Sequence, residues 1–370
     1  MSVPQATKLP AAMRGLVDAH SHAHNCVDGS RAVARALATS CSHVLVNATS
    51  PSDWAAVKST CAHFPGRALP QFGVHPWWAL DAGAPEGWVP LLAAALRDDA
   101  GAGVGEIGLD RSERALERSP LPAQLSALRA QLDLASELRR PVSVHCVRAH
   151  ALLHEEIKAA RARAGALPAA ILMHSWSGSP AHASTFKALG VPILFSFAGG
   201  LVGAACARLR GDAGRVPGAC GRDAVASLLS LASTEIAFET DAPDQSFSHF
   251  LSPELKARWG ASGDCDSGDW GEGRDVDSGD ATDSGAAGGA EGGTPLCCPP
   301  PPLPPSAAAD SSSPDAAVAR NEPAFLHHVV SAAALLRAQP DATPASIAAA
   351  AAALGERAAT NVREIFFPRV

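Results

Sequence analysis

GLVDAHSH, residues 15–22, is a short apolar run that ends in two histidines separated by one residue. In a β-strand, side chains at positions i and i+2 lie on the same face, so His20 and His22 can reach one metal ion. A single His-x-His pair is a weak indication, because two histidines near an N-terminus are more often surface residues than ligands. The interpretation therefore depends on whether later strands supply further ligands.

Seven further apolar runs follow, rich in Val, Ile, Leu and Phe, and helical patterns separate most of them. They cover residues 42–47, 69–75, 103–109, 141–145, 170–174, 192–197 and 235–241. Most are continuously apolar, as strands covered on both faces are. Eight strands alternating with helices predict an α/β protein of the (β/α)8 TIM barrel type, with a doubly wound open sheet as the alternative.

Helix signals stand between these runs. Between the fourth and fifth runs, an apolar stripe at helical spacing is formed by Leu125, Leu128, Leu132 and Ala135. Residues 51–53, which read PSD before Trp54, and Ser179-Pro180 are both typical of helix starts. Helical patterns also predict a final pair of helices near the C-terminus.

The composition changes abruptly between residues 260 and 320, where Asp-Ser-Gly recurs and residues 299–305 read PPPPLPP. Residues 261–319 hold eleven acidic residues and one arginine, a net charge of −10, so the −7 of the whole chain leaves +3 for the rest. Such a segment cannot bury enough apolar surface to offset its ordering entropy. A protein partner could bind its proline run, although a plain linker is the simpler interpretation.

These patterns divide the chain into four parts. We predict an N-terminal tail at residues 1–14, a barrel core at 15–259, a disordered acidic and proline-rich insertion at 260–320, and C-terminal helices of the same domain at 321–370. A monomer is expected.

Composition also restricts the class of protein. No apolar run is long enough to span a bilayer, and the N-terminus does not resemble a signal peptide. Nine cysteines at irregular spacing do not form a disulfide framework, which favours a reducing compartment, the cytoplasm or the nucleus. The nearly neutral remainder of the chain neither demands nor excludes a polyanionic substrate.

Side chains that can bind metal ions recur at or near the C-terminal ends of the apolar runs. They are His20, His22, His75, Glu106, His145, His174 and Asp241. In a barrel these strand ends converge on one face, where active sites are built. Each residue alone has an ordinary explanation, such as a hydrogen-bonded core histidine or a helix cap. Together they favour a metal cluster, because burying unpaired carboxylates and imidazoles is costly.

Several longer motifs accompany these residues. They are GVHP at 73–76, GEIGLD at 105–110, MHSWSG at 173–178, ETDAP at 239–243 and NEP at 321–323. In this order they resemble the signatures of the TatD-type metal-dependent hydrolases, deoxyribonucleases within the amidohydrolase superfamily of barrels. The resemblance spans residues 15–250 and 320–368.

The resemblance implies a site for two divalent metal ions. His20, His22 and Asp241 would hold the first ion, His145 and His174 the second, and Glu106 would bridge both. Such a pair generates hydroxide at neutral pH and polarises a phosphoryl oxygen. The family favours Mg²⁺, while histidine-rich ligation also suits Zn²⁺ or Mn²⁺.

Other residues are expected to act on the substrate. Asp241 is the candidate base, and His75, outside the ligand set, could donate to a substrate phosphate. Arg148 could hold a non-bridging phosphate oxygen. Trp77 and Trp176 could stack on the bases of a single strand, with core packing an equal alternative for Trp176.

The expected activity is hydrolysis of phosphodiester bonds by metal-activated hydroxide, as in a deoxyribonuclease or 3'-5' exonuclease with DNA or another nucleic acid as substrate. One alternative keeps the metal site but changes the bond to another ester or amide, for example an aminoacyl-tRNA ester. A second alternative is a non-catalytic scaffold that binds partners through the segment at 260–320.

Overall fold

The computed structural model describes residues 14–26, 28–200, 202, 219–243, 326–339 and 342–367. The predicted insertion at 260–320, the NEP motif and nearly all of the predicted N-terminal tail lie outside the described residues.

Eight strands form one sheet whose order follows the chain, and every neighbouring pair is parallel. The strands are β1 (Leu16–Ser21), β2 (Cys41–Asn47), β3 (Ala68–Phe72), β4 (Gly103–Asp110), β5 (Val142–Val147), β6 (Ile171–Met173), β7 (Ile193–Phe197) and β8 (Ile236–Phe238). This order confirms the TIM barrel, and the alternative of a doubly wound sheet is wrong, since no strand order reverses.

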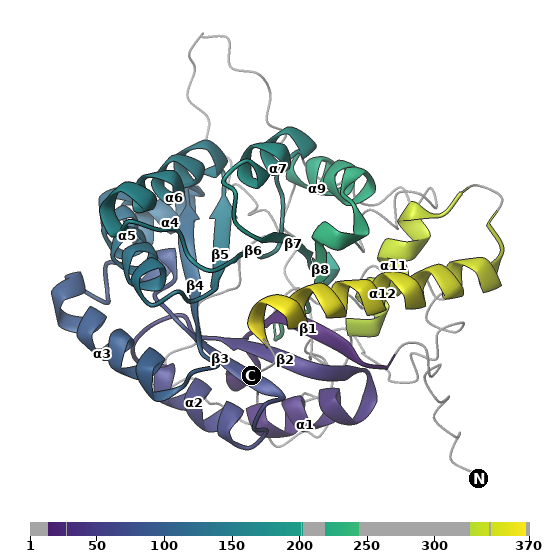
Figure 1. Cartoon of the computed structure of the whole chain (residues 1–370), viewed down its shortest axis with the longest axis horizontal. Helices are drawn as coiled ribbons and strands as arrows, with labels where there is room; N and C mark the ends of the chain where they lie inside the picture. The colour runs from purple at the N-terminus through teal and green to yellow at the C-terminus, as the bar shows by residue number, and fades with distance from the viewer. Residues whose placement is uncertain are drawn as a thin grey trace, which may run out of the picture.

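Helices surround the strands (Figure 1). The α-helices are α1 (Gly29–Thr39), α2 (Trp54–Ala62), α3 (Pro85–Asp98), α4 (Glu113–Arg118), α5 (Leu121–Glu137), α6 (His150–Ala164), α7 (Pro180–Lys187), α9 (Ala219–Ser230), α11 (Leu326–Arg337) and α12 (Pro344–Phe366). Short 3-10 turns are η2 (Ala23–Asn25), η3 (Pro76–Trp78) and η4 (Ser233–Glu235). Within the described residues, no helix has the length and apolar character required to cross a membrane.

The predicted helix signals act in different ways. The stripe on α5 packs inward, and Ser179 caps α7 by accepting a hydrogen bond from the backbone N–H of His182 at 3.3 Å. Asp53 stands at the N-cap position of α2 but its side chain does not cap that helix. Its carboxylate instead accepts hydrogen bonds from the N–H and hydroxyl of Thr49, which fixes the loop after β2.

Side-chain and backbone bonds join the two ends of the sheet, β1 and β8. Thr240 donates from its backbone N–H and its hydroxyl to the Asp18 carboxyl, at 2.9 and 2.6 Å. The N–H of Asp241 donates to the carbonyl of His20 at 3.0 Å. Burial raises the pKa of Asp18 well above its usual value. This seam holds the residues after β8 beside the histidines of β1.

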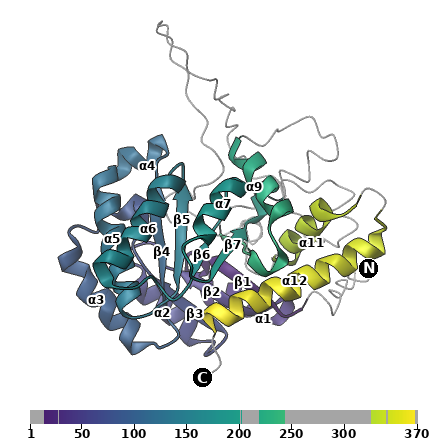
Figure 2. The ribbon, with the colours of Figure 1, turned by 45° about the horizontal axis from the view of Figure 1, so that its top comes forward.

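Helix α12 packs against the apolar residues at one end of the barrel interior. Its Ala359, Val362 and Phe366 form one buried cluster with residues such as Val17 and Leu45. Figure 2 shows α12 running alongside β1. Helix α11 also contributes to the buried core, through residues such as Leu326, Val329 and Val330.

Candidate metal centre

The barrel brings all seven of the metal-competent side chains predicted from the sequence into one buried region. His20 lies in β1, Glu106 in β4 and His145 in β5, while the other four follow strands β1, β3, β6 and β8. None of the seven is more than 4% exposed. We call His20, His22, His75, Glu106, His145, His174 and Asp241 the metal-ligand cluster.

Glu106 stands at the centre of this cluster, and its two carboxylate oxygens face different histidines. Oε2 lies 3.4 Å from Nε2 of His20 and 3.2 Å from Nε2 of His22. Oε1 lies 2.9 Å from Nδ1 of His145 and 3.0 Å from Nε2 of His174. The two halves of the cluster therefore meet at one carboxylate.

Asp241 belongs to the first half. Its Oδ1 lies 3.6 Å from Nε2 of His22 and 3.8 Å from Nε2 of His20. Asp241 adopts a positive φ of 53°, which is uncommon for a residue with a side chain and marks a tightly constrained position. His20, His22 and Asp241 thus form a group that could hold a metal ion.

The rear nitrogens of the histidines are held by oxygen acceptors. Nδ1 of His22 donates to the carbonyl of Asn47 at 2.8 Å, and Nδ1 of His174 donates to Oε1 of Glu239 at 3.0 Å. Nε2 of His145 lies 3.3 Å from Oδ2 of Asp110. In the neutral ring such bonds place the proton on the rear nitrogen, so the inward-facing nitrogen carries the lone pair that can bind a metal.

The inward nitrogens face one another at short range. Nε2 of His20 and Nε2 of His22 are 3.3 Å apart, and Nδ1 of His145 and Nε2 of His174 are 3.4 Å apart. Two lone pairs that converge in a buried space repel each other unless a proton or a metal ion lies between them. The donor set of imidazoles and carboxylates therefore fits divalent metal ions.

His75 has a different tautomer from the four ligating candidates. Its Nδ1 accepts a hydrogen bond from the backbone N–H of Trp77 at 3.2 Å, so the ring proton must be on Nε2 when the ring is neutral. That nitrogen lies 3.4 Å from Oε1 of Glu106 but makes no hydrogen bond to it. By position alone His75, Glu106 and His145 could hold an ion, but a protonated Nε2 is a donor rather than a ligand.

Burial and charge shift the titration of the cluster. Burial lowers the pKa of His20 to about 4 and that of His75 to about 3. Burial opposes the charge of Glu106 as well, but the surrounding imidazoles, His75 first, hold the pKa of this carboxyl well below its usual value. Burial also opposes the charge of His22 and His174, but Glu106 outweighs it and raises the pKa of His22 to about 9 and that of His174 well above its usual value. Near pH 7, therefore, His75 is a neutral donor and Glu106 is an anion.

Sequence reasoning gave no role to two carboxylates that support the histidines. Glu239 is completely buried, and its Oε1 accepts from His174 and from the backbone N–H of Ser175 at 2.7 Å. Asp110 accepts from the N–H of Ser112 and faces His145. Glu239 could also ligate an ion with His20 and His174, but its bond to His174 favours an orienting role. Asp110 ends the GEIGLD motif and Glu239 begins the ETDAP motif. Their place in these motifs was the sequence signal that could have identified them.

The predicted substrate-binding residues lie in contrasting places. Arg148 is exposed directly after β5. Trp77 and Trp176 are buried, at 2% and 1% exposure, and Trp176 packs against Phe186 and Phe195. Stacking on a base requires an open ring face, and these buried positions do not favour it. The stacking role of both residues stays a prediction.

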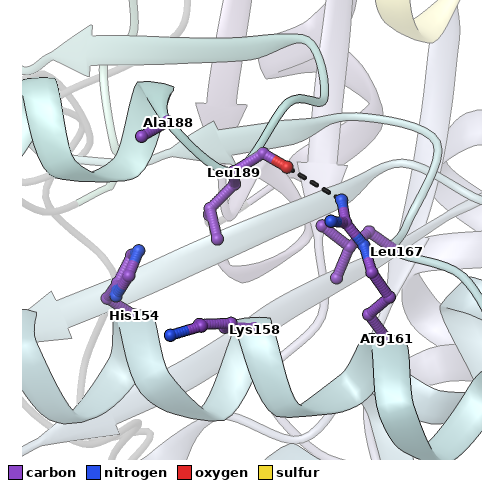
Figure 3. A pocket seen from close by; sticks show the side chains of 6 residues that line it. All are labelled: His154, Lys158, Arg161, Leu167, Ala188 and Leu189. Carbon is purple, nitrogen blue, oxygen red and sulfur yellow. Dashed lines mark hydrogen bonds between the residues drawn. The ribbon is translucent and has the colours of Figure 1, made fainter.

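A separate hollow lies on the outer wall of the barrel, between α6 and the end of α7 (Figure 3). Its volume is about 270 Å³, and it is lined by His154, Lys158, Arg161, Leu167, Ala188 and Leu189. Arg161 donates there to the carbonyl of Leu189 at 2.9 Å. None of these residues belongs to the metal-ligand cluster.

Comparisons with known proteins agree with this geometry. A family model described as TatD related DNase matches residues 17–356. Two bacterial relatives are named 3'-5' ssDNA/RNA exonuclease TatD. The protein of Citrobacter rodentium is 31% identical, and the alignment covers 58% of this chain and 72% of the relative. The protein of Yersinia pseudotuberculosis is 30% identical, and the alignment covers 54% of this chain and 67% of the relative. The Cut9-interacting protein scn1 of Schizosaccharomyces pombe is 26% identical, and the alignment covers 50% of this chain and 78% of the relative.

Solved structures show the same fold. A TatD homolog of Escherichia coli k12 aligns with a TM-score of 0.60 and 19% identity, covering 97% of this chain and 100% of that chain. A hydrolase TatD family protein of Entamoeba histolytica aligns with a TM-score of 0.61 and 13% identity, covering 96% and 99%.

Proposed function

This chain belongs to the TatD family of hydrolases, and we propose that it is a metal-dependent nuclease that degrades single-stranded nucleic acid from the 3' end. The observation that carries the proposal is Glu106, whose two oxygens each face a separate pair of histidine ligands. A carboxylate in that position suits a bridge between two cations, and two-metal sites are typical of phosphodiester hydrolysis.

His20, His22 and Asp241 would hold one ion, His145 and His174 the other, and Glu106 would touch both. When bound, divalent ions such as Mg²⁺, Zn²⁺ or Mn²⁺ supply positive charge that stabilises the negative charge developing on a phosphoryl oxygen. Glu239 and Asp110 orient His174 and His145 for this purpose.

The chain itself provides the groups that move and hold protons. Asp241 is the proposed base, which takes the proton of the attacking water through a carboxylate oxygen on the His20 and His22 side of the cluster. Nε2–H of His75 would donate to a phosphate oxygen, because that nitrogen has no hydrogen-bond acceptor among the described residues. Arg148, exposed after β5, would hold a non-bridging oxygen.

The direction of degradation is taken from the two bacterial relatives, whose names specify 3'-5' action on ssDNA and RNA. A second candidate is a role in protein interaction without catalysis. It is favoured by the Schizosaccharomyces pombe relative, which is named for its interaction with Cut9. The buried and complete ligand set opposes this candidate, since such groups are costly to bury without a function.

The test is degradation of end-labelled single strands with and without a chelator. We expect activity to disappear on chelation, to return with added divalent metal, and to stop at a strand whose 3' end is protected by phosphorothioate linkages. Asp241→Asn should lower kcat/KM by at least about a hundredfold. Asp133→Asn, which removes a carboxylate bonded to Arg163 on the outer wall, is the matched control.

Turnover that resists the chelator, or that is the same in Asp241→Asn and Asp133→Asn, would contradict the proposal. Turnover of acyl esters in place of nucleic acid would assign the site to another bond.

A further inference from the structure

Trp77 connects the metal-ligand cluster to an exposed arginine. The indole Nε1–H of Trp77 donates to Oδ2 of Asp110 at 2.6 Å, and the same oxygen lies 3.3 Å from His145. The guanidinium carbon of Arg114 lies over the Trp77 ring, 5.1 Å from its centroid. Two side chains, Trp77 and Asp110, therefore separate Arg114 from a proposed metal ligand.

Two further arginines leave the neighbouring strand ends. Arg111 follows the last residue of β4 and Arg148 follows the last residue of β5, and these strand ends are paired in register. The N–H of Arg111 donates to the carbonyl of Val147 at 2.9 Å. Figure 2 shows α4, which carries Arg114, beyond the upper ends of β4 and β5. We call Arg111, Arg114 and Arg148 the arginine rim.

The rim arginines are exposed, and apart from the stacking of Arg114 on Trp77 their side chains make no hydrogen bond or ion pair with any residue that the structure describes. Arg118, one turn further along α4, is different. It donates to the carbonyl of Trp77 at 3.1 Å and to Asp81 at 3.2 Å, and stacks on Trp78 at 3.7 Å. Arg118 thus holds the loop together, while the charges of the rim are available to a ligand.

The position and chemistry of the rim point to a phosphate ligand. A guanidinium binds phosphate oxygens in bidentate fashion, and stacking on Trp77 limits the rotamers that Arg114 would lose on binding. Glu113 and Glu117 are also exposed on α4 and offset part of this charge. The rim therefore suits a few defined phosphate contacts rather than a broad basic surface.

We propose that Arg111 and Arg114 bind the backbone phosphate next to the one that is cleaved, beside Arg148 at the scissile phosphate. This inference rests on the proposed nuclease activity. It assigns the substrate class as an oligonucleotide with neighbouring phosphates rather than a simple phosphodiester.

The test compares Arg114→Gln with Arg97→Gln on a short single-stranded oligonucleotide. Arg97 is also exposed, but it lies in the last turn of α3, which leads into the start of β4 at the opposite end of the barrel. We expect Arg114→Gln to raise KM for the oligonucleotide about tenfold with a smaller change in kcat, because a charge-assisted bond to substrate is lost. Arg97→Gln should behave as the unaltered protein.

Salt dependence separates a phosphate contact from a structural effect. In Arg114→Gln, the slope of log binding constant against log salt should fall by about one, and Arg114→Lys should restore it, because it retains the charge. KM for bis(p-nitrophenyl) phosphate, which has one phosphate, should rise less than KM for the oligonucleotide.

If the unaltered protein cleaves the oligonucleotide and Arg114→Gln has the same KM and the same salt slope, the rim proposal is overturned while the nuclease proposal stands. If the unaltered protein cleaves neither substrate, the nuclease proposal fails. In that case the salt dependence of oligonucleotide binding tests the rim proposal. A smaller salt slope in Arg114→Gln but not in Arg97→Gln supports the proposal, and equal salt slopes in the two variants overturn it.

Discussion

The barrel gathers charged groups around a glutamate in two places, inside at Glu106 and on the outer wall at Glu156 in α6. Glu156 accepts hydrogen bonds from Nε and an NH2 group of Arg129 at 2.8 and 2.6 Å, and lies 3.8 Å from Arg163. Arg163 in turn donates to Asp133 at 2.9 Å. Around Glu106 the basic groups are five imidazoles, which are buried with it.

The two clusters differ in the chemistry of their basic groups. Arginines always carry protons, so the cluster on the outer wall satisfies its carboxylates without any ligand. Imidazoles can exchange a proton for a metal ion. Burial opposes the charge of His22 and His174, but the nearby carboxylates outweigh it and raise the pKa values of both rings, so the inner cluster can hold either protons or metal ions. A group of charged residues therefore indicates a metal site when its basic members can give up their protons to a metal ion, and a structural network when they cannot.

The same substitution at both glutamates gives the largest expected contrast. Glu106→Gln should lose at least about a hundredfold in kcat/KM and lower the metal content, because the carboxylate that both halves of the cluster share loses its charge. Glu156→Gln should leave both kcat/KM and the metal content unchanged. Turnover and elemental analysis of the two variants measure this, and equal metal content would place the ions elsewhere.

A smaller effect is expected from Glu239, which touches His174 rather than the substrate. Glu239→Gln should weaken metal affinity by about ten- to a hundredfold, the range found when an orienting carboxylate is removed. Competition with a fluorescent chelator measures it. Glu235→Gln is the control, since Glu235 pairs with Lys187 at 2.7 Å outside the cluster. If Glu235→Gln weakened metal affinity as much as Glu239→Gln, the orienting role would be lost.

The smallest effect concerns the outer wall and depends on pH. The hydrogen bond from Arg129 holds the pKa of Glu156 below its usual value, so the pair stabilises the folded state above the pKa of an unfolded glutamate. That stability is lost as the pH falls through the lower, folded-state pKa. Because Arg129 is half exposed, Glu156→Gln should cost only about 0.5–1 kcal/mol at pH 7.

Urea unfolding at pH 7 and at pH 3 checks this. The difference between Glu156→Gln and the unaltered protein should shrink at the lower pH, whereas a constant difference would mean that packing and not charge is responsible.

The predicted ligands illustrate how far sequence reasoning reached. Strand ends of a parallel barrel meet on one face, so His20, Glu106, His145 and Asp241 could be expected together without coordinates. Their pairing around the two oxygens of Glu106 could not be expected, because it depends on rotamers and on strand register. Equally, Trp77 looked suited to stacking on a base, yet it turns inward to Asp110, and Arg114 covers its ring.

The sequence by itself determined the number and order of the strands, the helices between them and the residues able to bind metal, since apolar periodicity and side-chain chemistry are local properties. Only the tertiary structure decided which nitrogen of each imidazole faces inward, because that depends on acceptors from distant strands. Asn47 fixes His22 and Glu239 fixes His174 in this way. The same long-range packing left Arg114 without an ionic partner among the described residues and engaged Arg118 with Asp81.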